Sequence, residues 1–199
     1  MNDLLGRATI VVMVLGWIGF SVGFALRRRE ARGRTARRDW VSLLGIVLQM
    51  AGFGVAWSLQ RQPLGSPFLG RGLAPQTVFF VLTLLLSGWS AWAVIGAVRA
   101  LGKQWSIQAR VLENHELVTA GPFATVRHPI YSAMIAMLVA TGFAIGDWRA
   151  VLGGLALELT GTWLRVRGED RLLRETFGTV WEAYAARVPA LVPRRLSDR

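Results

Sequence analysis

The sequence predicts an all-α polytopic membrane protein with about five transmembrane helices. Three observations support this fold class. The 199 residues are 53% hydrophobic and only 18% charged, whereas soluble domains are roughly 25% charged. Several uncharged apolar runs approach or exceed the length of about 20 residues that a spanning helix needs. The formal net charge is nevertheless +11, which is explained if the positive charge lies in water-facing loops.

The same composition excludes several functional classes. The chain has no Cys, so disulfide frameworks, thiolate metal sites and cysteine nucleophiles are excluded. Its two His residues are too few for a His-rich metal cage, and we expect no bound metal. Nucleic-acid binders are also basic, but they spread Lys and Arg over a soluble face. We therefore expect no nucleic-acid partner.

The first three helices are predicted from uncharged apolar runs at residues 8–26, 40–59 and 76–98. They make up a first region, 1–100, with a basic loop between the first two helices. Because the basic cluster Arg27-Arg28-Arg29 follows the first run, while only Arg7 precedes it, this run predicts a retained helix and not a cleaved signal peptide.

The second region, 101–199, begins with a polar loop and continues with two shorter apolar stretches at residues 130–146 and 150–164. The polar link Asp147-Trp148-Arg149 predicts that they form a helical hairpin over 130–164. Each arm is at the short limit for a bilayer, so a full and a partial crossing both remain open.

An amphipathic C-terminal helix is predicted beyond Arg167, because apolar residues recur there at spacings of three and four. These residues are Leu172, Leu173, Phe177, Trp181 and Tyr184. This helix is expected to lie on the membrane or over the site.

The distribution of arginine predicts the orientation in the membrane, because basic loops stay in the cytoplasm. The loop between the first two helices holds seven Arg residues: Arg27, Arg28, Arg29, Arg32, Arg34, Arg37 and Arg38. The next loop, 60–75, has only Arg61 and Arg71. We therefore expect the N-terminus outside and the C-terminus in the cytoplasm, and the composition favours a bacterial inner membrane. The seven-Arg loop is expected to contact anionic membrane lipids.

Two pairs of glycines, Gly19 with Gly23 and Gly142 with Gly146, have the spacing that lets helices approach closely in lipid. Such pairs serve packing within a chain or dimerisation, so the oligomeric state stays open.

Polar residues gather at the start of the predicted hairpin and near its end. Arg127 and His128 stand immediately before Pro129, which suits a first helical turn. There, exposed N–H groups favour anionic ligand groups. Glu158, Thr162, Arg165 and Glu169 follow at offsets of 4, 7 and 11 residues, which places them on one helix face. This stripe is expected to form one wall of a site, with the role of Glu158 left open.

An ordered set of motifs resembles the isoprenylcysteine carboxyl methyltransferase family. The set comprises Leu101-Gly-Lys-Gln-Trp-Ser106, His115-Glu-Leu-Val-Thr-Ala-Gly-Pro-Phe123, Arg127-His-Pro-Ile-Tyr131, Glu169-Asp170, Phe177-Gly-x-x-Trp-x-x-Tyr184 and Val188-Pro189. It covers roughly residues 101–193, while the first three helices match only as generic membrane helices.

The resemblance implies a membrane methyltransferase that binds S-adenosylmethionine on the cytoplasmic side. The cofactor contacts that it implies fall on Gln108, His115, Glu116, Leu117, Val118, Phe123, His128, Pro129, Ile130, Tyr131 and Glu169. The substrate-contacting arginine falls on Arg165, and we consider Arg127 a second candidate for contact with an anion. The family usually has Tyr at the position of Phe123 and Glu at that of Asp170, and these departures bear more on the substrate than on the cofactor.

The resemblance also implies a lipophilic small-molecule or lipid substrate that enters from the bilayer. O-methylation of a carboxylate, such as that of a prenylcysteine-like substrate, agrees with the residues, because a carboxylate needs no general base and an arginine holds it well. N- or S-methylation of a lipid or small molecule remains open. A membrane NADPH-dependent reductase, a non-enzymatic lipid-binding scaffold and a transporter are the alternatives from other classes.

Overall fold

The computed structural model describes residues 2–26, 35–38, 41–67, 72–102, 110–112 and 116–193. The helices in these ranges are α1 (Asn2–Ala25), α2 (Val41–Ser58), α3 (Leu73–Leu101), α4 (Pro129–Ala144), α5 (Trp148–Phe177) and α6 (Thr179–Arg187). A short 3-10 helix covers Gly121–Ala124. Strands β1 (Thr35–Arg38) and β2 (Arg110–Leu112) pair antiparallel. Apart from this small sheet the described fold is helical, which confirms the predicted class.

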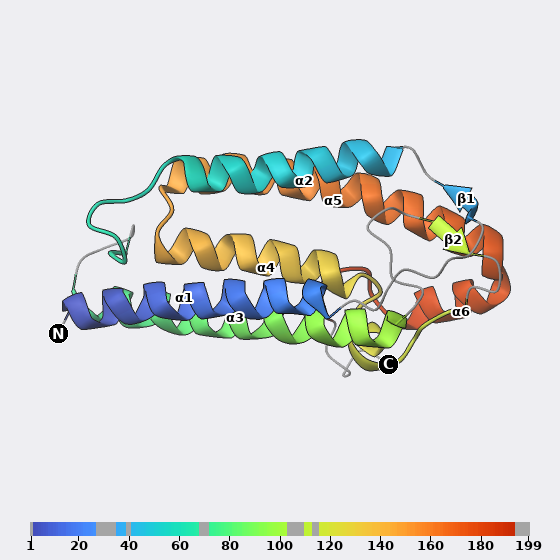
Figure 1. The fold of residues 1–199 in the computed structure, drawn as a ribbon, viewed down its shortest axis with the longest axis horizontal. Helices are drawn as coiled ribbons and strands as arrows, with labels where there is room; N and C mark the ends of the chain where they lie inside the picture. Colours follow the sequence, from blue (N-terminus) through green and yellow to red (C-terminus); the bar gives the residue numbers. More distant parts are fainter. Residues whose placement is uncertain are drawn as a thin grey trace.

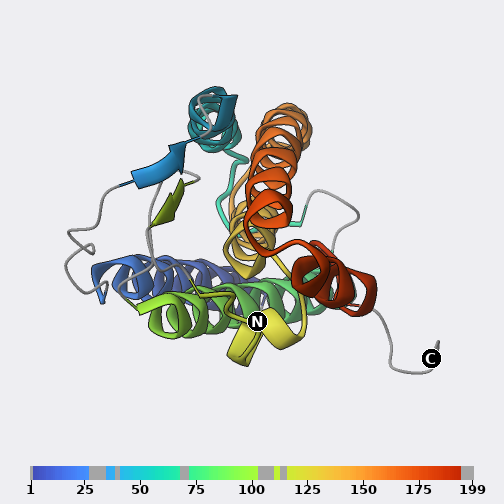
Figure 2. The same ribbon diagram turned by 90° about the vertical axis from the view of Figure 1, so that its right-hand side faces the viewer.

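The long helices form two layers that share α4. Figure 1 shows α1 alongside α3 in one layer and α2 alongside α5 in the other, with α4 between them. Figure 2 views the bundle nearly along the helices and shows the same arrangement. Because α2 comes from the first half of the sequence and α5 from the second, the two predicted regions interlock and do not pack as separate bodies.

Among the described residues, three helices are long and apolar enough to cross a membrane: α1 over Leu4–Ala25, α2 over Val41–Ser58 and α3 over Leu73–Leu101. They correspond to the three uncharged runs in the sequence. α4 is apolar but has only 16 residues, about 24 Å of helix against roughly 30 Å of hydrocarbon. Because α4 is shorter than the hydrocarbon core is thick, its length agrees with a helix that begins near one membrane surface.

The C-terminal part of the predicted hairpin differs from expectation. The second arm does not end near residue 164: α5 is continuous from Trp148 to Phe177 and takes in Leu172, Leu173 and Phe177, so a separate helix begins only at Thr179. No proline interrupts this stretch, so the helix continues out of its apolar part into a charged part. It ends before Gly178, whose φ of +52° favours glycine. The short α6 then carries Trp181 and Tyr184.

Glycines allow the helices to approach closely within the chain. A side chain at Gly23 would meet Val94 of α3, with Cβ 2.5 Å from its Cγ1, and one at Gly142 would lie 2.8 Å from Val151 of α5. Both predicted glycine pairs therefore contribute to packing inside this protein. Two further pairs, Gly45 with Gly161 and Gly52 with Gly154, bring α2 against α5.

Arg61 joins the helices at the end of the bundle opposite the charged part of α5. Its guanidinium donates to the carbonyl oxygens of Gly142 at 2.9 Å, Phe143 at 2.8 Å and Ser66 at 2.7 Å, and also to that of Gly146. The carbonyls of Gly142 and Phe143 belong to the last turn of α4. Arg61 therefore caps α4 and holds the loop after α2 in place.

Candidate functional site

The entrance to α4 positions two of the predicted site residues. Pro129 is the first residue of α4, as predicted, and His128 precedes it as the N-cap. A tail segment, residues 188–191, lies across this entrance. Its carbonyl oxygens accept hydrogen bonds from the backbone N–H groups of Arg127 (to Pro189, 2.8 Å) and His128 (to Ala190, 3.0 Å). The tail thereby pairs donors that the helix leaves open and fixes where His128 and Tyr131 lie.

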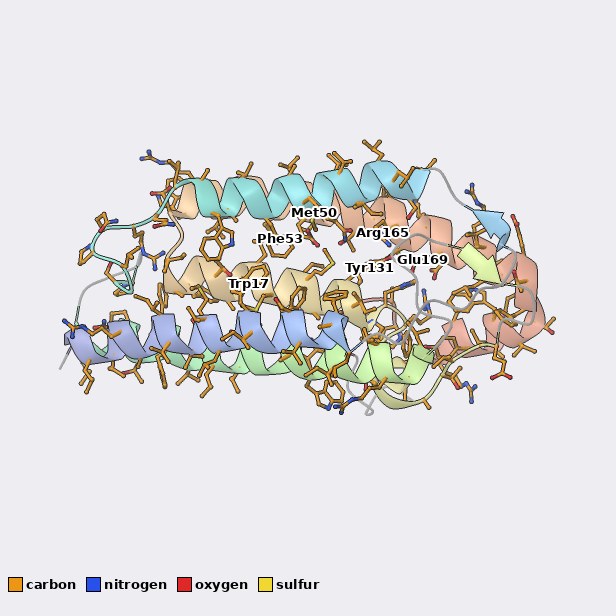
Figure 3. The ribbon with its side chains drawn as sticks, viewed as in Figure 1. Trp17, Met50, Phe53, Tyr131, Arg165 and Glu169 are labelled. Carbon is orange, nitrogen blue, oxygen red and sulfur yellow. The ribbon has the colours of Figure 1, made fainter. Side chains whose placement is uncertain are left out.

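The charged part of α5 brings Arg165, Glu169 and Asp170 to the same place. Figure 3 shows Arg165 and Glu169 on α5 close to Tyr131 at the start of α4. The Arg165 Nε donates to the Tyr131 hydroxyl at 2.8 Å, and the Tyr131 hydroxyl donates to Glu169. The Arg165 guanidinium also lies 4.9 Å from the centre of the Tyr131 ring and 3.6 Å from Glu169 Oε1. Arginine, phenol and carboxylate therefore form one connected group.

His128 lies between the two acidic residues. Its Nε2 is 2.8 Å from Asp170 Oδ1, and its Nδ1 is 3.3 Å from Glu169 Oε2. The imidazole stacks on the Tyr131 ring, with 5.7 Å between centres and 15° between planes. Burial alone would lower the pKa of His128, but hydrogen bonds and charge from Asp170 and Glu169 outweigh burial and raise that pKa. This shift, with a carboxylate oxygen facing each ring nitrogen, favours the protonated form of His128.

Arg127 connects the site to α6 and the tail. It donates to Asp170 Oδ2 at 3.1 Å, to the Ala185 carbonyl at 3.1 Å and to the Val188 carbonyl at 2.7 Å. Its guanidinium lies 5.5 Å from the centre of the buried Trp181 ring. Arg127 thus holds the elements around the site, and its predicted contact with an external anion stays a prediction.

We call these six side chains the site cluster: Arg127, His128, Tyr131, Arg165, Glu169 and Asp170. Burial would raise the pKa values of Glu169 and Asp170, but His128 and the neighbouring arginines lower both. Both carboxylates are therefore ionised at neutral pH, and the basic side chains of Arg127, His128 and Arg165 face them where α4 begins.

The other predicted contacts occupy different environments. Glu116 is exposed, while Leu117 and Val118 are half-buried in an extended segment before the 3-10 helix. The carbonyl of Phe123 accepts a hydrogen bond of 2.7 Å from the Tyr184 hydroxyl. Pro129 is buried, and Ile130 packs against the hydrophobic core. Gln108 and His115 lie outside the described residues.

Sequence reasoning did not select Asp170 as a site residue, although it contacts both His128 and Arg127. Its position in the acidic pair Glu169-Asp170 was the available signal. Adjacent helical residues point about 100° apart, so spacing along one face selected Glu169 alone.

The buried Glu158 belongs to a second polar group, between α2 and α5. The Gln49 amide donates to Thr162 Oγ1 at 2.9 Å and to Glu158 Oε1 at 3.4 Å. All three side chains are at most 1% exposed. The predicted stripe on α5 therefore has two parts: Glu158 and Thr162 contact α2, and Arg165 and Glu169 contact α4.

Within the described ranges, no group of three or more His, Cys, Asp or Glu side chains is arranged to hold a metal ion. Of the cluster, Glu169 has 25% of its side chain exposed, whereas the stacked rings of His128 and Tyr131 and the Arg165 side chain are buried beside it.

Comparisons with known proteins give matches of two kinds. A family model described as the isoprenylcysteine carboxyl methyltransferase family matches residues 80–175. Cobalt-zinc-cadmium resistance protein CzcN of Cupriavidus metallidurans is 33% identical over 59% of this chain and 60% of its own length. Nickel-cobalt-cadmium resistance protein NccN of Alcaligenes xylosoxydans is 32% identical over 66% of this chain and 69% of its own length.

A plant enzyme is also similar. Protein-S-isoprenylcysteine O-methyltransferase B of Arabidopsis thaliana is 32% identical over 44% of this chain and 44% of its own length. The aligned part of the chain thus spans between 44% and 69% of these relatives. The family match covers α4, most of α5 and all six residues of the site cluster.

Proposed function

Because the chain belongs to the isoprenylcysteine carboxyl methyltransferase family, we propose that it transfers a methyl group from S-adenosylmethionine to a lipophilic acceptor at the membrane. The proposed acceptor group is a carboxylate, such as that of a prenylcysteine-like molecule. The plant relative's name specifies O-methylation of isoprenylcysteine. The two bacterial relatives are named for metal resistance, and their names specify no methyl acceptor.

The charge of the site cluster is the observation that carries the proposal. Three basic side chains, those of Arg127, His128 and Arg165, face the two carboxylates of Glu169 and Asp170. This arrangement favours an anionic acceptor over an ammonium group. A carboxylate is ionised at neutral pH and reacts without a general base, whereas an amine or thiol must lose a proton. Both ring nitrogens of His128 face carboxylate oxygens, so His128 is poorly placed to take that proton.

The residues also fit the proposed cofactor chemically. When bound, S-adenosylmethionine supplies an electrophilic methyl group on a sulfonium. Glu169 has 25% of its side chain exposed, so its carboxylate is available to accept hydrogen bonds from hydroxyl or ammonium groups. His128 and Tyr131 offer a stacked, polar-edged wall. Gln108, residues 115–118 and Phe123 complete the proposed cofactor site.

Arg165 is the residue that we propose to hold the acceptor carboxylate. Its side chain is 8% exposed and is oriented by Tyr131 and Glu169. A fixed, partly desolvated guanidinium binds a carboxylate strongly and in a defined plane. Methyl transfer requires the reacting atoms to be held about 3–3.5 Å apart, so the role proposed for Arg165 is to fix the acceptor oxygen.

Apolar side chains on the membrane side of the cluster suit a lipophilic acceptor. Trp17 of α1 lies 5.4 Å from Phe53 and 6.1 Å from Trp57 of α2, measured between ring centres. Figure 3 shows Trp17, Met50 and Phe53 in the part of the bundle between the cluster and its opposite end. We propose that the acceptor's apolar part approaches from the bilayer along these helices.

We propose that the protein resides in a bacterial inner membrane with its N-terminus outside and its C-terminus in the cytoplasm. The ends of α1, α3 and α5 that lead into basic segments lie at one end of the bundle, as Figure 1 shows. Basic segments stay cytoplasmic, and the site cluster lies at this same end.

Calorimetric titration of the detergent-solubilised protein with S-adenosylhomocysteine tests the cofactor. We expect micromolar binding by the wild type and at least about tenfold weaker binding by Glu169→Gln, because a neutral amide replaces a charged acceptor. Glu182→Gln, an exposed change on α6, is the control. Absence of binding by folded wild-type protein would contradict the proposal, and binding of NADPH in its place would favour the reductase.

A panel of acceptors then tests the acceptor group. We expect methylation of a prenylated cysteine carboxylate and none of its carboxamide. Arg165→Lys is expected to raise KM for the acceptor about tenfold or more, because lysine cannot form the planar bidentate contact. Faster turnover of an aminophospholipid or a prenylated thiol would instead establish N- or S-methylation.

A further inference from the structure

Arg165 reaches the site cluster by crossing the contact between α5 and α2 at a glycine. A Cβ built on Gly45 would lie 2.5 Å from Arg165 Cγ and 3.3 Å from Arg165 Cδ. It would also lie 2.8 Å from the carbonyl oxygen of Gly161. The aliphatic part of Arg165 therefore occupies the space that any other residue at position 45 would fill.

Gly52 lies seven residues after Gly45 on α2. It makes the same kind of close contact with α5, but Arg165 is not among the atoms that a Cβ there would meet. A Cβ there would lie 2.7 Å from the Gly154 carbonyl oxygen and 3.0 Å from the Glu158 backbone nitrogen. Both glycines are buried in the interface between α2 and α5. They differ in that only Gly45 borders the arginine stem.

The opposite side of Arg165 is occupied by Tyr131. The guanidinium lies 4.9 Å from the Tyr131 ring centre, and Nε donates to the hydroxyl at 2.8 Å. The side chain is thus confined between the backbone of α2 and the first turn of α4. A methyl group on α2 must push the stem away from α2 or push the two helices apart.

We infer that Gly45 is a positioning residue, whose missing side chain sets where the Arg165 guanidinium lies and thereby sets the affinity for the acceptor carboxylate. This inference rests on the proposed function, in which Arg165 holds that carboxylate. Carbon atoms in contact sit about 3.5–4 Å apart, so Arg165 Cγ must move by about 1 Å in Gly45→Ala. A misplacement of about 1 Å can cost about a hundredfold in rate.

The kinetic test compares Gly45→Ala with Gly52→Ala as the matched control. Both variants carry the same close approach to a backbone oxygen of α5, so both are expected to lose stability to a similar degree. Only Gly45→Ala is expected to raise KM for the acceptor, by about tenfold or more, with the Kd for S-adenosylhomocysteine unchanged within about twofold. Gly54→Ala, where a Cβ would meet nothing within 4 Å, controls for the substitution itself.

A double-mutant cycle separates action through Arg165 from general loosening of the helices. In an Arg165→Lys background, Gly45→Ala is expected to raise KM by less than about twofold, because the positioned group is already gone. The inference would be overturned if Gly45→Ala raised KM for the acceptor equally in the wild-type and Arg165→Lys backgrounds. It would also be overturned if Gly52→Ala raised this KM as much as Gly45→Ala does.

A second measurement does not depend on turnover. Phenylglyoxal modifies accessible guanidinium groups, and peptide mass spectrometry reports the modification rate at Arg165 alone. We expect this rate to rise several-fold in Gly45→Ala and to stay at the wild-type value in Gly52→Ala. Equal rates in all three proteins would refute the inference. A changed rate in a protein that methylates nothing would instead count against the proposed function and leave the positioning by Gly45 established.

Discussion

Asp170 pairs with two cations of the site cluster at once. One carboxylate oxygen lies 2.8 Å from His128 Nε2 and the other lies 3.1 Å from an Arg127 nitrogen. Because His128 stacks on Tyr131 and Arg127 binds the tail, the one carboxylate connects the proposed cofactor wall to the elements that support it.

Asp170→Asn is therefore expected to destabilise the protein by about 2 kcal/mol, since two charge-assisted hydrogen bonds at a half-buried carboxylate lose their anion. For a chain of this size the loss corresponds to a Tm lowered by about 4–8 °C. Thermal unfolding of the solubilised protein, followed by tryptophan fluorescence, measures the change. Glu182→Gln on the exposed face of α6 serves as the comparison, and equal Tm values for the two variants would refute the role of Asp170.

The pH dependence of stability follows from the shifted pKa values. The raised pKa of His128 gives a stabilisation that is complete below about pH 6.5, its ordinary pKa, and is lost as pH rises through the raised value. The lowered pKa values of Glu169 and Asp170 give a stabilisation that is present above about pH 4 and is lost as pH falls through the lowered values. We expect Tm to be highest between these limits.

His128→Gln is expected to remove the alkaline part of this profile. Measurement of Tm between pH 5 and 9 for the wild type and the variant tests the assignment. An alkaline decline of the same size in both proteins would show that another group titrates.

At the scale of single residues, the sequence predicted His128, Tyr131, Arg165 and Glu169 as members of one site, and the structure brings these four together. Gly45 was not predicted because its role depends on which residue of another helix faces it. That pairing is set by the crossing of α2 and α5, which no periodicity within one helix encodes.

At the scale of elements, Arg61 stabilises a junction of three segments. It donates to carbonyl oxygens at the end of α4, in the turn before α5 and in the loop after α2. Backbone pairing continues the junction, with Arg61 N–H donating to the Ile145 carbonyl at 2.9 Å. Removal of the guanidinium leaves several of these carbonyls without their donor.

Arg61→Met is accordingly expected to cost about 2 kcal/mol, or about 4–8 °C in Tm. The affinity for S-adenosylhomocysteine should stay unchanged, because Arg61 contacts the C-terminal end of α4, whereas the site cluster lies at the N-terminal end of α4. Arg149→Met is the control, since Arg149 is exposed near the same junction. Weaker ligand binding without a change in Tm would contradict this division of roles.

The sequence predicted the end of a helix where the helix and its apolar run end together. It did not predict the end of a helix that continues beyond its apolar run into a charged segment. The apolar runs gave α1, α2 and α3 to within a few residues. The continuation of α5 to Phe177 was missed because its composition becomes charged while its backbone hydrogen bonding continues. The signal for the true end was Gly178, which hydropathy does not detect.

At the scale of the whole molecule, the interlocked layers place the site cluster at one end and the Arg61 junction at the other. The proposed orientation therefore predicts that residues near Arg61 lie outside and those on α6 lie in the cytoplasm. Because the chain has no Cys, a single introduced thiol reports on its own position without background.

We expect the thiol of Gln62→Cys to react with a membrane-impermeant maleimide in right-side-out vesicles. The thiol of Glu182→Cys should react only after the vesicles are permeabilised. Both positions are exposed, so a lack of reaction reports on membrane side and not on burial. The opposite labelling pattern would invert the proposed topology.

The overall architecture followed from composition, but the interlocking of the two halves did not. Hydropathy identifies which segments enter the membrane and leaves their partners unspecified. The pairing of α2 with α5 is set by glycines that face each other across the two helices. Their spacing of seven residues on each helix is visible in the sequence only after the partner helix is known.

The tail segment 188–191 has a consequence for how the protein is made. Arg127 and His128 receive their hydrogen-bond partners from Pro189 and Ala190, which the ribosome adds some sixty residues later in synthesis. α4 can enter the membrane well before that moment, but its first turn stays incomplete until the tail emerges. A ribosome stalled before the tail would therefore display an inserted bundle without a finished site, and ligand binding would begin only after the tail has emerged.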